Sequence, residues 1–451
     1  MKIMQVTHSF PPYTFAGTEV YAYALAVELS KRHRVSVVFR VNQPHEKEYA
    51  LSVNNRGDFA TYSINRTFNT CDSFGQTYDD HIVSAIGGRL LDEVNPDVVH
   101  IQHLLFLSIG IIKEAWKRRI PVVFTLNDYW LMCHKGQLIK NDFKVCQGYT
   151  IDGCRVCLEA QLSITKYSIF FYNLLRRHLP VQLTQFVKSL YILFARKTFL
   201  SQRKSSTLIL KRYASMQAIT SRIDYFVAPS QFIKKKFIAF GFPQEKIFFF
   251  SYGIKHRSVS PGDKTYSPNL RIGYIGTLIP TKGVSILISA FRKIIKKNIR
   301  LSIYGKLAPY AGYEAYYRQI IKSARDERIA FMGQFDNSKI FDILRSIDIL
   351  VVPSLWLENS PLVIHEAFIS KTPVIASRIG GIPELICDGM NGLLFNPGDA
   401  DDLSEKIKQV MENPEILACM RRNMPAIKSI EENAMEMLEV YKKASMNCGT
   451  V

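Results

Sequence analysis

Short apolar runs alternate with helix-period segments along most of the chain, and this alternation constrains the fold more than any other feature. Four runs in the first half are typical of buried strands: Lys2–Thr7, Val35–Val41, Val98–His103 and Val122–Leu126. Three segments between them have the period of amphipathic helices: Thr18–Lys31, Thr77–Val94 and Leu107–Lys117. Two further strands follow, Asp224–Pro229 and Lys246–Tyr252, with a helix at Phe232–Phe240 between them. Such alternation predicts a parallel, doubly wound sheet.

The alternation restarts after a loop rich in Lys, Ser, Pro and Gly. Five runs in the second half read as strands: Leu270–Ile275, Arg300–Tyr304, Ile329–Met332, Ile347–Val352 and Pro373–Ser377. A helix is expected at Lys282–Lys297. We therefore expect an α/β chain with two facing Rossmann-like domains and a cleft between them, where ligands bind outside the carboxyl ends of the strands. The expected boundaries are an N-terminal domain at 1–255, a linker at 256–269, a second domain at 270–425 and a C-terminal helix at 426–451, which would pack back on the first domain.

The chain is strongly basic. Its 58 Lys and Arg face 39 Asp and Glu, for a formal net charge of +19. Nucleic acid, an anionic membrane surface or an acidic substrate could each explain such a charge. Hydrophobic residues make up 47% of the chain, which excludes intrinsic disorder.

Most of this charge lies in one stretch. Between Ala160 and Lys236 there are 14 Lys or Arg and a single acidic residue, Asp224. Aromatic and aliphatic residues are interleaved with the charges, which is typical of basic amphipathic helices at a membrane interface. The alternative is a helical subdomain on the first sheet with a solvated basic face. We expect a basic helical insert at 160–216 that docks on an anionic membrane.

The sequence pattern predicts neither a transmembrane helix nor a signal peptide. No run of 18 apolar residues is free of charge, and the N-terminus lacks an apolar signal core. The eight cysteines are few for this length, which favours a reducing compartment. We expect a cytoplasmic protein, peripheral at the inner face of the membrane.

Two segments are suited to binding phosphate. Ala16-Gly17-Thr18-Glu19 follows the first strand and opens a helix, so the Gly17 backbone could approach an anion at the helix N-terminus. An ordinary strand-to-helix turn is the alternative. Lys282 begins a helix, where a cation is unfavourable unless an anion such as a diphosphate lies there. A solvated lysine is the alternative.

A third segment combines helix-start signals with two glutamates. In Leu355 to Glu366, Ser360 is a good N-cap and Pro361 a good first helical residue. We expect the N–H groups of Leu362 and Val363 to point into the cleft. Glu358 in the loop could then reach a sugar hydroxyl, and Glu366 inside the helix a ribose diol.

The second half resembles the donor domain of retaining GT-B glycosyltransferases of the glycosyltransferase 4 type, also called glycosyl transferases group 1. The matching residues occur in order over about 130 positions: Ile275-Gly276-Thr277-Leu278, Lys282-Gly283, Asp348, Val352-Pro353-Ser354, Glu358-Asn359-Ser360-Pro361, Glu366-Ala367, Pro373 to Ser377, Gly380 to Glu384 and Asp388 to Phe395. The first half resembles the acceptor domain of this family through Pro11-Pro12, Gly17-Thr18-Glu19 and Pro96 to His100.

The resemblance implies transfer of a sugar from a UDP- or GDP-sugar to an acceptor hydroxyl, with retention. It places the diphosphate on Lys282 and the ribose on Glu366. Glu358 and the backbone of Asn359, Ser360, Pro361 and Leu362 would address the donor sugar and phosphates, and Gly17 would complete the phosphate cradle. No cofactor or metal is required if Lys282 and helix N-termini carry the leaving-group charge. The acceptor would be a glycan or lipid-linked, as in the synthesis of lipopolysaccharide, O-antigen, capsule or another surface glycan.

Two positions depart from the family pattern. Thr277 stands where an Arg is usual, and Asn127 stands where a His is frequent. Asn127 can hydrogen-bond a sugar hydroxyl but cannot take a proton at neutral pH. His103 and His100 are nearby candidates for substrate contacts, although structural histidines are the alternative. The catalytic candidates are therefore Glu358, Lys282, His103 and Asn127.

Four cysteines form a cluster in the sequence, in a Cys-rich loop at 133–157. Cys133, Cys146, Cys154 and Cys157 have the spacing C-x12-C-x7-C-x2-C, and four thiolates could hold a structural zinc ion. Free thiols or a disulfide are the alternatives.

Other function classes remain as alternatives. A GT-B epimerase or phosphorylase would share the donor-site residues. A basic nucleic-acid-binding protein would explain the charge, but the second half is nearly balanced in charge and its motifs suit a small phosphate ligand. The expected partners are a nucleotide sugar, a glycan or lipid-linked acceptor and an anionic membrane surface, and not nucleic acid.

Overall fold

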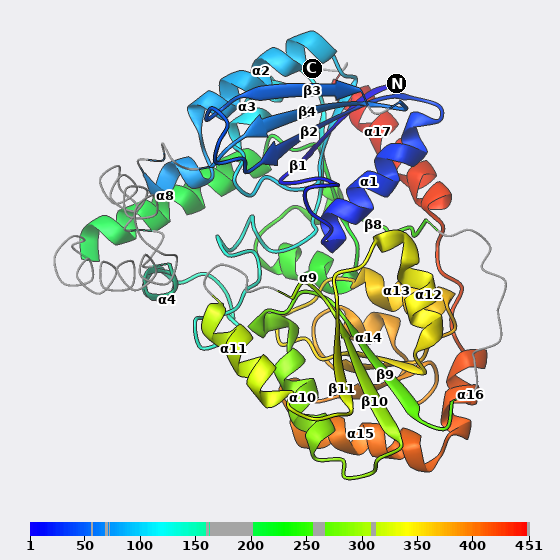
Figure 1. Cartoon of the computed structure of the whole chain (residues 1–451). Coiled ribbons are helices and arrows are strands. Elements are labelled where there is room, and N and C mark those ends of the chain that lie inside the picture. The colour runs from blue at the N-terminus through cyan, green and yellow to red at the C-terminus, as the bar shows by residue number, and fades with distance from the viewer. Residues whose placement is uncertain are drawn as a thin grey trace.

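The structure is a computed structural model, and it describes residues 1–55, 57–67, 71, 73–158, 162, 202–255, 267–307 and 313–448. Two α/β domains lie one above the other in Figure 1, and the last helix returns to the first domain. The predicted class, two Rossmann-like domains built on parallel sheets, is confirmed.

The N-terminal sheet has eight strands in the order β3-β4-β2-β1-β5-β6-β7-β8. Neighbouring strands are parallel except for β3 and β4, which pair antiparallel at one edge. The strands are β1 (Lys2–Thr7), β2 (Arg34–Val41), β3 (Leu51–Asn55), β4 (Ala60–Asn65), β5 (Val98–Ile101), β6 (Val122–Thr125), β7 (Tyr225–Ala228) and β8 (Ile247–Phe249).

The helices of this domain cover both faces of its sheet. Helix α1 packs on one face together with α17, and α2 and α3 pack on the other with α9. The helices are α1 (Gly17–Ser30), α2 (His81–Val94), α3 (Gly110–Lys117), α4 (Ile151–Cys157), α8 (Gln202–Thr220) and α9 (Gln231–Ala239).

The C-terminal sheet has six parallel strands in the order β11-β10-β9-β12-β13-β14. They are β9 (Leu270–Ile275), β10 (Ile299–Tyr304), β11 (Ile329–Gly333), β12 (Ile349–Val352), β13 (Val374–Ser377) and β14 (Gly392–Phe395). The helices are α10 (Val284–Arg292), α11 (Glu314–Ser323), α12 (Ile340–Ser346), α13 (Leu362–Ile369), α14 (Ile382–Leu385), α15 (Ala400–Glu412), α16 (Glu415–Arg422) and α17 (Ile430–Cys448). One apolar cluster runs from the α2–α3 side of the first domain into α12 and α13 of the second.

Three strands escaped the sequence analysis: β3, β4 and β14. Every residue of β3 is exposed, and its apolar pattern is limited to Leu51 and Val53. Strand β4 buries polar side chains, and Asn65 at its end hydrogen-bonds the backbone oxygens of Gln43, Glu46 and Lys47. Polar burial of this kind hides the strand from a hydrophobic pattern.

The helix expected at Lys282–Lys297 is shorter at both ends. Gly283 has a φ of +70°, which separates a 3₁₀ turn from the helix that starts at Val284. The helix ends at Arg292, and the Arg328 guanidinium then takes the carbonyl oxygens of Ile294 and Lys296 as hydrogen-bond acceptors. These carbonyls are therefore satisfied outside a helix.

Helix α17 lies beside α1 on the first domain (Figure 1). Its buried side chains Met437, Val440 and Tyr441 join the apolar cluster under α1. The Tyr441 hydroxyl lies 2.6 Å from His100 Nδ1, and the Tyr21 hydroxyl donates to Asn433 Oδ1 at 2.8 Å. Both ends of the chain thus contribute to one core.

The basic insert expected at 160–216 lies outside the described residues, apart from Leu162 and the part from Gln202 onward that begins α8. Residues 256–266 of the expected linker also lie outside them. Among the described helices, none is long and apolar enough to span a lipid bilayer.

The chain passes between the two domains twice, and the two connecting segments contact each other at Gly253. A Cβ at this residue would lie 2.4 Å from Ser429 O, 2.6 Å from Asn433 Cβ and 2.8 Å from Ile430 Cα. Two of these three atoms belong to the backbone, so little relaxation is available.

We expect Gly253→Ala to lower the free energy of unfolding by about 1–3 kcal/mol, because the added methyl overpacks this crossing. Urea unfolding measures the loss. Gly75→Ala is the matched control, since the nearest atom to its Cβ is Ser73 Oγ at 3.7 Å. Equal effects of the two substitutions would contradict the tight crossing.

Candidate functional site

A buried ion pair occupies the loop after β12. One oxygen of Glu358, Oε1, accepts hydrogen bonds from Lys282 Nζ, Ser354 Oγ and Trp356 Nε1, each at 2.7 Å. Lys282 Nζ also lies 5.2 Å from the centre of the Trp356 ring. The Glu358 side chain is 5% exposed and that of Lys282 29%. The structure therefore brings these two candidates into direct contact and leaves part of the lysine accessible.

The start of α13 differs from the sequence prediction. Pro361 has a ψ of 117° and occupies the N-cap position, so the helix begins at Leu362. Ser360 lies one residue too early to cap, and its Oγ instead contacts His365 Nε2 at 2.8 Å. The prediction that Ser360 is the N-cap is wrong, and no side chain of the described residues caps this helix. Its first N–H groups keep the hydrogen-bonding capacity of an open helix end.

Glu366 lies one turn inside α13 and is buried. Burial raises the pKa of Glu366 to about 7 from the usual 4.5. Within the described residues, its carboxylate has no hydrogen bond or ion pair. Its neighbour His365 is also buried, and burial lowers the pKa of His365 to about 4. The candidate ribose carboxylate thus has an unused capacity to accept hydrogen bonds.

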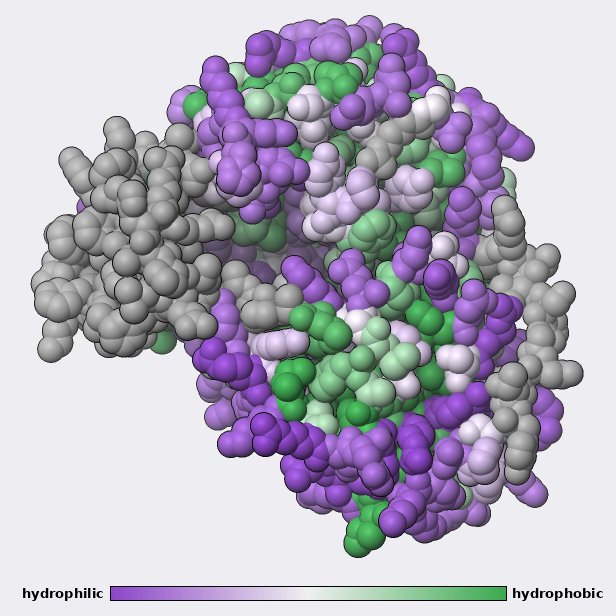
Figure 2. Space-filling view, in the orientation of Figure 1, coloured by the Kyte–Doolittle hydropathy of each residue, from purple (hydrophilic) through white to green (hydrophobic). Residues whose placement is uncertain are grey.

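The starts of α1 and α13 face each other across the domains. A Cβ on Gly17 would lie 3.8 Å from Leu362 Cδ1. Helix α1 begins at Gly17 after Ala16, which supplies no side-chain cap. Two open, electropositive helix ends therefore meet at the domain boundary. Figure 2 shows a hollow in the molecular surface where the two domains meet.

Asn359 joins the donor-side loop to the N-terminal domain. Its Nδ2 donates to Leu126 O at 3.0 Å and lies 3.4 Å from Asn127 O. Its Oδ1 accepts from Ser230 Oγ at 2.7 Å. Both ends of this buried amide are thus occupied by the first domain.

A second contact of this kind caps α9. The Glu384 carboxylate of the second domain accepts from the N–H groups of Gln231 at 2.8 Å and Phe232 at 2.5 Å. Ser230 Oγ accepts from Ile233 N at 3.2 Å. The N–H groups of Gln231 and Phe232 are therefore satisfied by Glu384 only while the domains remain together, whereas that of Ile233 is satisfied within the first domain.

The side chains of Asn127 and His100 both hydrogen-bond other groups in the protein interior. Asn127 Nδ2 donates to Gln102 O at 2.7 Å, and Asn127 Oδ1 accepts from the Tyr252 hydroxyl at 2.5 Å. His100 contacts Thr125 and Tyr441, and burial lowers the pKa of His100 to about 3. Neither side chain is placed to meet a sugar hydroxyl without breaking these bonds.

His103 and Asp128 form a pair at the carboxyl ends of β5 and β6. His103 Nε2 lies 3.0 Å from Asp128 Oδ2. His103 Nδ1 accepts from Leu105 N at 2.9 Å, so in the neutral ring the proton lies on Nε2 and points at Asp128. Asp128 directly follows Asn127 in the loop after β6.

A second carboxylate–histidine pair lies beside it at the end of β1. His8 Nε2 lies 3.2 Å from Glu19 Oε1, and the His8 and His103 rings are 4.6 Å apart. Burial raises the pKa of Glu19, but the hydrogen bond and charge of His8, together with hydrogen bonds from the backbone and Thr14, lower it overall. We name His8, His103, Asn127 and Asp128 the N-terminal sheet edge. The sequence analysis missed His8, whose only signal is its position directly after β1.

The expected zinc site is not formed. The described residues contain no group of three or more His, Cys, Asp or Glu that could hold a metal ion. Cys133, Cys146, Cys154 and Cys157 are free thiols. Cys157 Sγ contacts Lys135 Nζ at 3.6 Å and Cys146 Sγ donates to Gly148 O at 3.2 Å, so these thiols face polar groups of their own loop.

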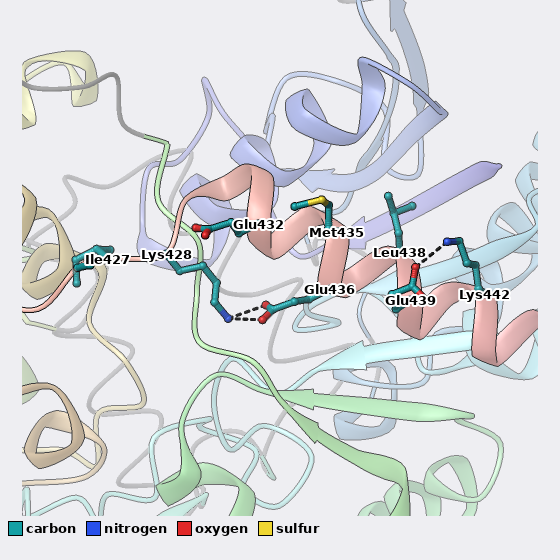
Figure 3. Close-up of a pocket in the computed structure, with 9 residues that line it drawn as sticks. Ile427, Lys428, Glu432, Met435, Glu436, Leu438, Glu439 and Lys442 are labelled. Carbon is teal, nitrogen blue, oxygen red and sulfur yellow. Dashed lines mark hydrogen bonds and ion pairs between the residues drawn. The ribbon is translucent and has the colours of Figure 1, made fainter.

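A surface groove of about 790 Å³ lies along α17, remote from the sheet edge. Figure 3 shows that its charged side chains point at one another: Lys428 pairs with Glu436 at 2.6 Å, and Lys442 with Glu439 at 2.7 Å. Each of these cations is already neutralised within the groove, so the groove does not share the electropositive character of the helix starts.

Both halves of the chain match known family models. Residues 263–426 match the model described as glycosyl transferases group 1, and residues 15–145 match glycosyltransferase family 4. An uncharacterised glycosyltransferase of Methanocaldococcus jannaschii is 33% identical over 38% of this chain. The chain spans about half the length of that relative, 48%. An uncharacterised 42.6 kDa protein from the cps region of Klebsiella pneumoniae is 22% identical over 85% of this chain and 87% of its own length.

Solved structures share the whole fold. Sucrose-phosphate synthase of Thermosynechococcus elongatus has a TM-score of 0.67 at 16% identity, covering 98% of each chain. HepE of Anabaena in complex with UDP-glucose has a TM-score of 0.60 at 16% identity, covering 100% of each chain. At these identities the likeness establishes the fold.

The raised pKa of Glu366 predicts a pH dependence of stability. The folded state holds a proton on Glu366 up to about pH 7, and the unfolded state releases it near 4.5. Stability contributed by this proton is full below 4.5 and is lost as pH rises to 7, by about 3 kcal/mol. Glu366→Gln removes this titration.

Urea unfolding at pH 4.5 and pH 8 tests the sign. The stability of Glu366→Gln relative to the parent chain should rise by about 3 kcal/mol between these pH values. A difference between the two proteins that does not change with pH would show that Glu366 titrates normally.

Proposed function

We propose a glycosyl transfer reaction for this chain, which belongs to the GT-B glycosyltransferases of the group 1 and family 4 types. A sugar would pass from a nucleotide-diphosphate sugar to an acceptor hydroxyl, with retention of configuration at the anomeric carbon. One observation carries the proposal: the uncapped starts of α1 and α13 face each other beside the Lys282–Glu358 pair.

The diphosphate would lie between these helix starts. The N–H groups at Gly17 and at Leu362 supply donors from opposite domains, and Lys282 supplies a full positive charge. This charge is fixed in place before the reaction by Glu358 and Trp356. Preorganised positive charge stabilises the leaving nucleoside diphosphate more strongly than solvent does.

The two glutamates would have different tasks. Glu366 has no polar partner within the described residues, so a ribose diol could donate to it and satisfy a buried acceptor. Glu358 already accepts three hydrogen bonds on Oε1, which leaves Oε2 for a hydroxyl of the donor sugar. The backbone of Asn359, Ser360 and Pro361 would form the floor between them.

The acceptor would bind against the N-terminal sheet edge. His103 lies there, while the Asn127 side chain supports the wall through Gln102 and Tyr252 rather than facing substrate. UDP-glucose in HepE supports a UDP-sugar donor, and a GDP-sugar remains the second candidate. The Klebsiella relative from a cps region supports a role in surface glycan synthesis.

An anionic membrane surface would present a lipid-linked acceptor. The described part of the basic region includes Lys211 on α8 and Lys234, Lys235 and Lys236 on α9. Charge of this density attracts acidic lipids by about 1 kcal/mol per lysine. The basic surface belongs to the domain that would receive the acceptor.

Lys282→Ala tests the donor site. We expect transfer from UDP-glucose, UDP-galactose, UDP-N-acetylglucosamine and GDP-mannose to alkyl glycosides to fall at least about a hundredfold, because the leaving diphosphate loses its cation. Release of nucleoside diphosphate measures transfer, and it should require acceptor. Lys297→Ala, on an exposed lysine of the same domain, should change nothing. Full transfer by Lys282→Ala would refute the proposed donor site.

Charge reversal tests the membrane contact. Lys211→Glu together with Lys235→Glu should weaken binding to phosphatidylglycerol-containing vesicles by about 2 kcal/mol or more. Co-sedimentation at several salt concentrations measures this, and binding by the parent chain should weaken with salt. The paired reversal Lys296→Glu with Lys297→Glu, at two exposed lysines of the second domain, controls for net charge. Vesicle binding that changes neither with salt concentration nor with the paired reversal would contradict membrane docking.

A further inference from the structure

Asp128 is the accessible carboxylate of the N-terminal sheet edge. Its side chain is 26% exposed, whereas that of His103 is 5% exposed. Asn127 is 7% exposed, and both ends of its side-chain amide hydrogen-bond other protein groups. The interior polar residues Gln102 and Thr125 are fully buried. The remaining member of the edge, His8, has a buried Nδ1 and directs Nε2 at Glu19.

The protein fixes the orientation of this carboxylate. Asp128 Oδ1 accepts from Trp130 N at 2.8 Å, and Oδ2 accepts from His103 Nε2 at 3.0 Å. The backbone of Gly136 approaches so closely that a Cβ there would lie 2.6 Å from Oδ2. Each carboxylate oxygen has two lone pairs, so both still have acceptor capacity.

The backbone that precedes this carboxylate lies next to the donor-side loop. Asn127, which precedes Asp128, has its carbonyl oxygen 3.4 Å from Asn359 Nδ2. Asn359 directly follows Glu358 and precedes Ser360, both of the loop that would floor the donor sugar. A group that binds Asp128 would therefore lie near the boundary between the two domains.

We propose that Asp128 accepts the hydrogen bond of the attacking acceptor hydroxyl, and that His103 is a positioning residue that holds Asp128 in place. The inference rests on the proposed function and deepens it by naming the group that meets the acceptor. A charged acceptor orients a hydroxyl more strongly than a neutral amide does, so Asp128 supplies at the sheet edge a contact that the occupied amide of Asn127 does not.

Asp128→Asn and Asp128→Ala test the inference. We use the four nucleotide sugars and the alkyl glycosides above, and take the pair with the highest turnover by the parent chain. Asp128→Asn should lower kcat/KM for the acceptor about tenfold, and Asp128→Ala should lower it further. KM for the nucleotide sugar and its slow hydrolysis by water should stay within about twofold, since the donor contacts remain. Asp142→Asn is the matched control, because Asp142 is 55% exposed in the following loop.

His103 variants separate positioning from folding. Gln keeps an N–H donor near the Nε2 position and Ala does not. His103→Gln should therefore keep more acceptor turnover than His103→Ala, with KM for the nucleotide sugar unchanged in both. Equal losses in both variants, together with a raised KM for the nucleotide sugar, would mean a merely structural histidine.

The outcomes distinguish this inference from the function beneath it. If Asp128→Asn and Asp128→Ala transfer like Asp142→Asn while Lys282→Ala is inactive, the role of Asp128 is refuted and the glycosyl transfer stands. The proposed function is refuted if Lys282→Ala is fully active. It is also refuted if the parent chain transfers no sugar from any of the four nucleotide sugars to any alkyl glycoside.

Discussion

The arrangement of the whole candidate site depends on one buried amide. Asn359 belongs to the donor-side loop, yet its side chain hydrogen-bonds Ser230 and the backbone of Leu126 in the first domain. A buried amide that loses its partners is costly, so the loop is held against the first domain. The facing helix starts at Gly17 and Leu362, and the cap that Glu384 places on α9, all require the same docked arrangement.

In this docked arrangement, the two glutamates Glu358 and Glu366 lie in contrasting electrostatic environments. Glu358 accepts hydrogen bonds from three donors, one of which is the ammonium group of Lys282. Glu366, eight positions further on, is buried without such a partner, and its pKa rises to about 7. The environment, rather than the residue type, places one carboxylate among three hydrogen-bond donors and leaves the other buried without a polar partner among the described residues.

Much of this fold could be predicted from the sequence, because its central strands are buried on both faces and read as apolar runs. Strands β1 and β9 have the predicted bounds, Lys2–Thr7 and Leu270–Ile275. Edge strand β3 could not be found, since none of its residues is buried. Glu358, Asn359, Ser360 and Glu366 share one loop and helix, so local sequence suffices to group them, whereas Lys282 reaches Glu358 from 76 positions away. The occupation of Asn127 by Tyr252 depends on a contact between segments 125 residues apart, which no local pattern encodes.

The return of α17 to the first domain also bears on how the chain is made. The core under α1 contains Ile3 from the first strand and Tyr441 from the last helix, so it is complete only when both ends have been synthesised. The second domain is continuous in sequence and lies between these ends. On the ribosome, where domains normally fold in the order of their synthesis, the domain begun first is the one finished last. The donor-side half can reach its final packing while the other half still waits for its closing helix.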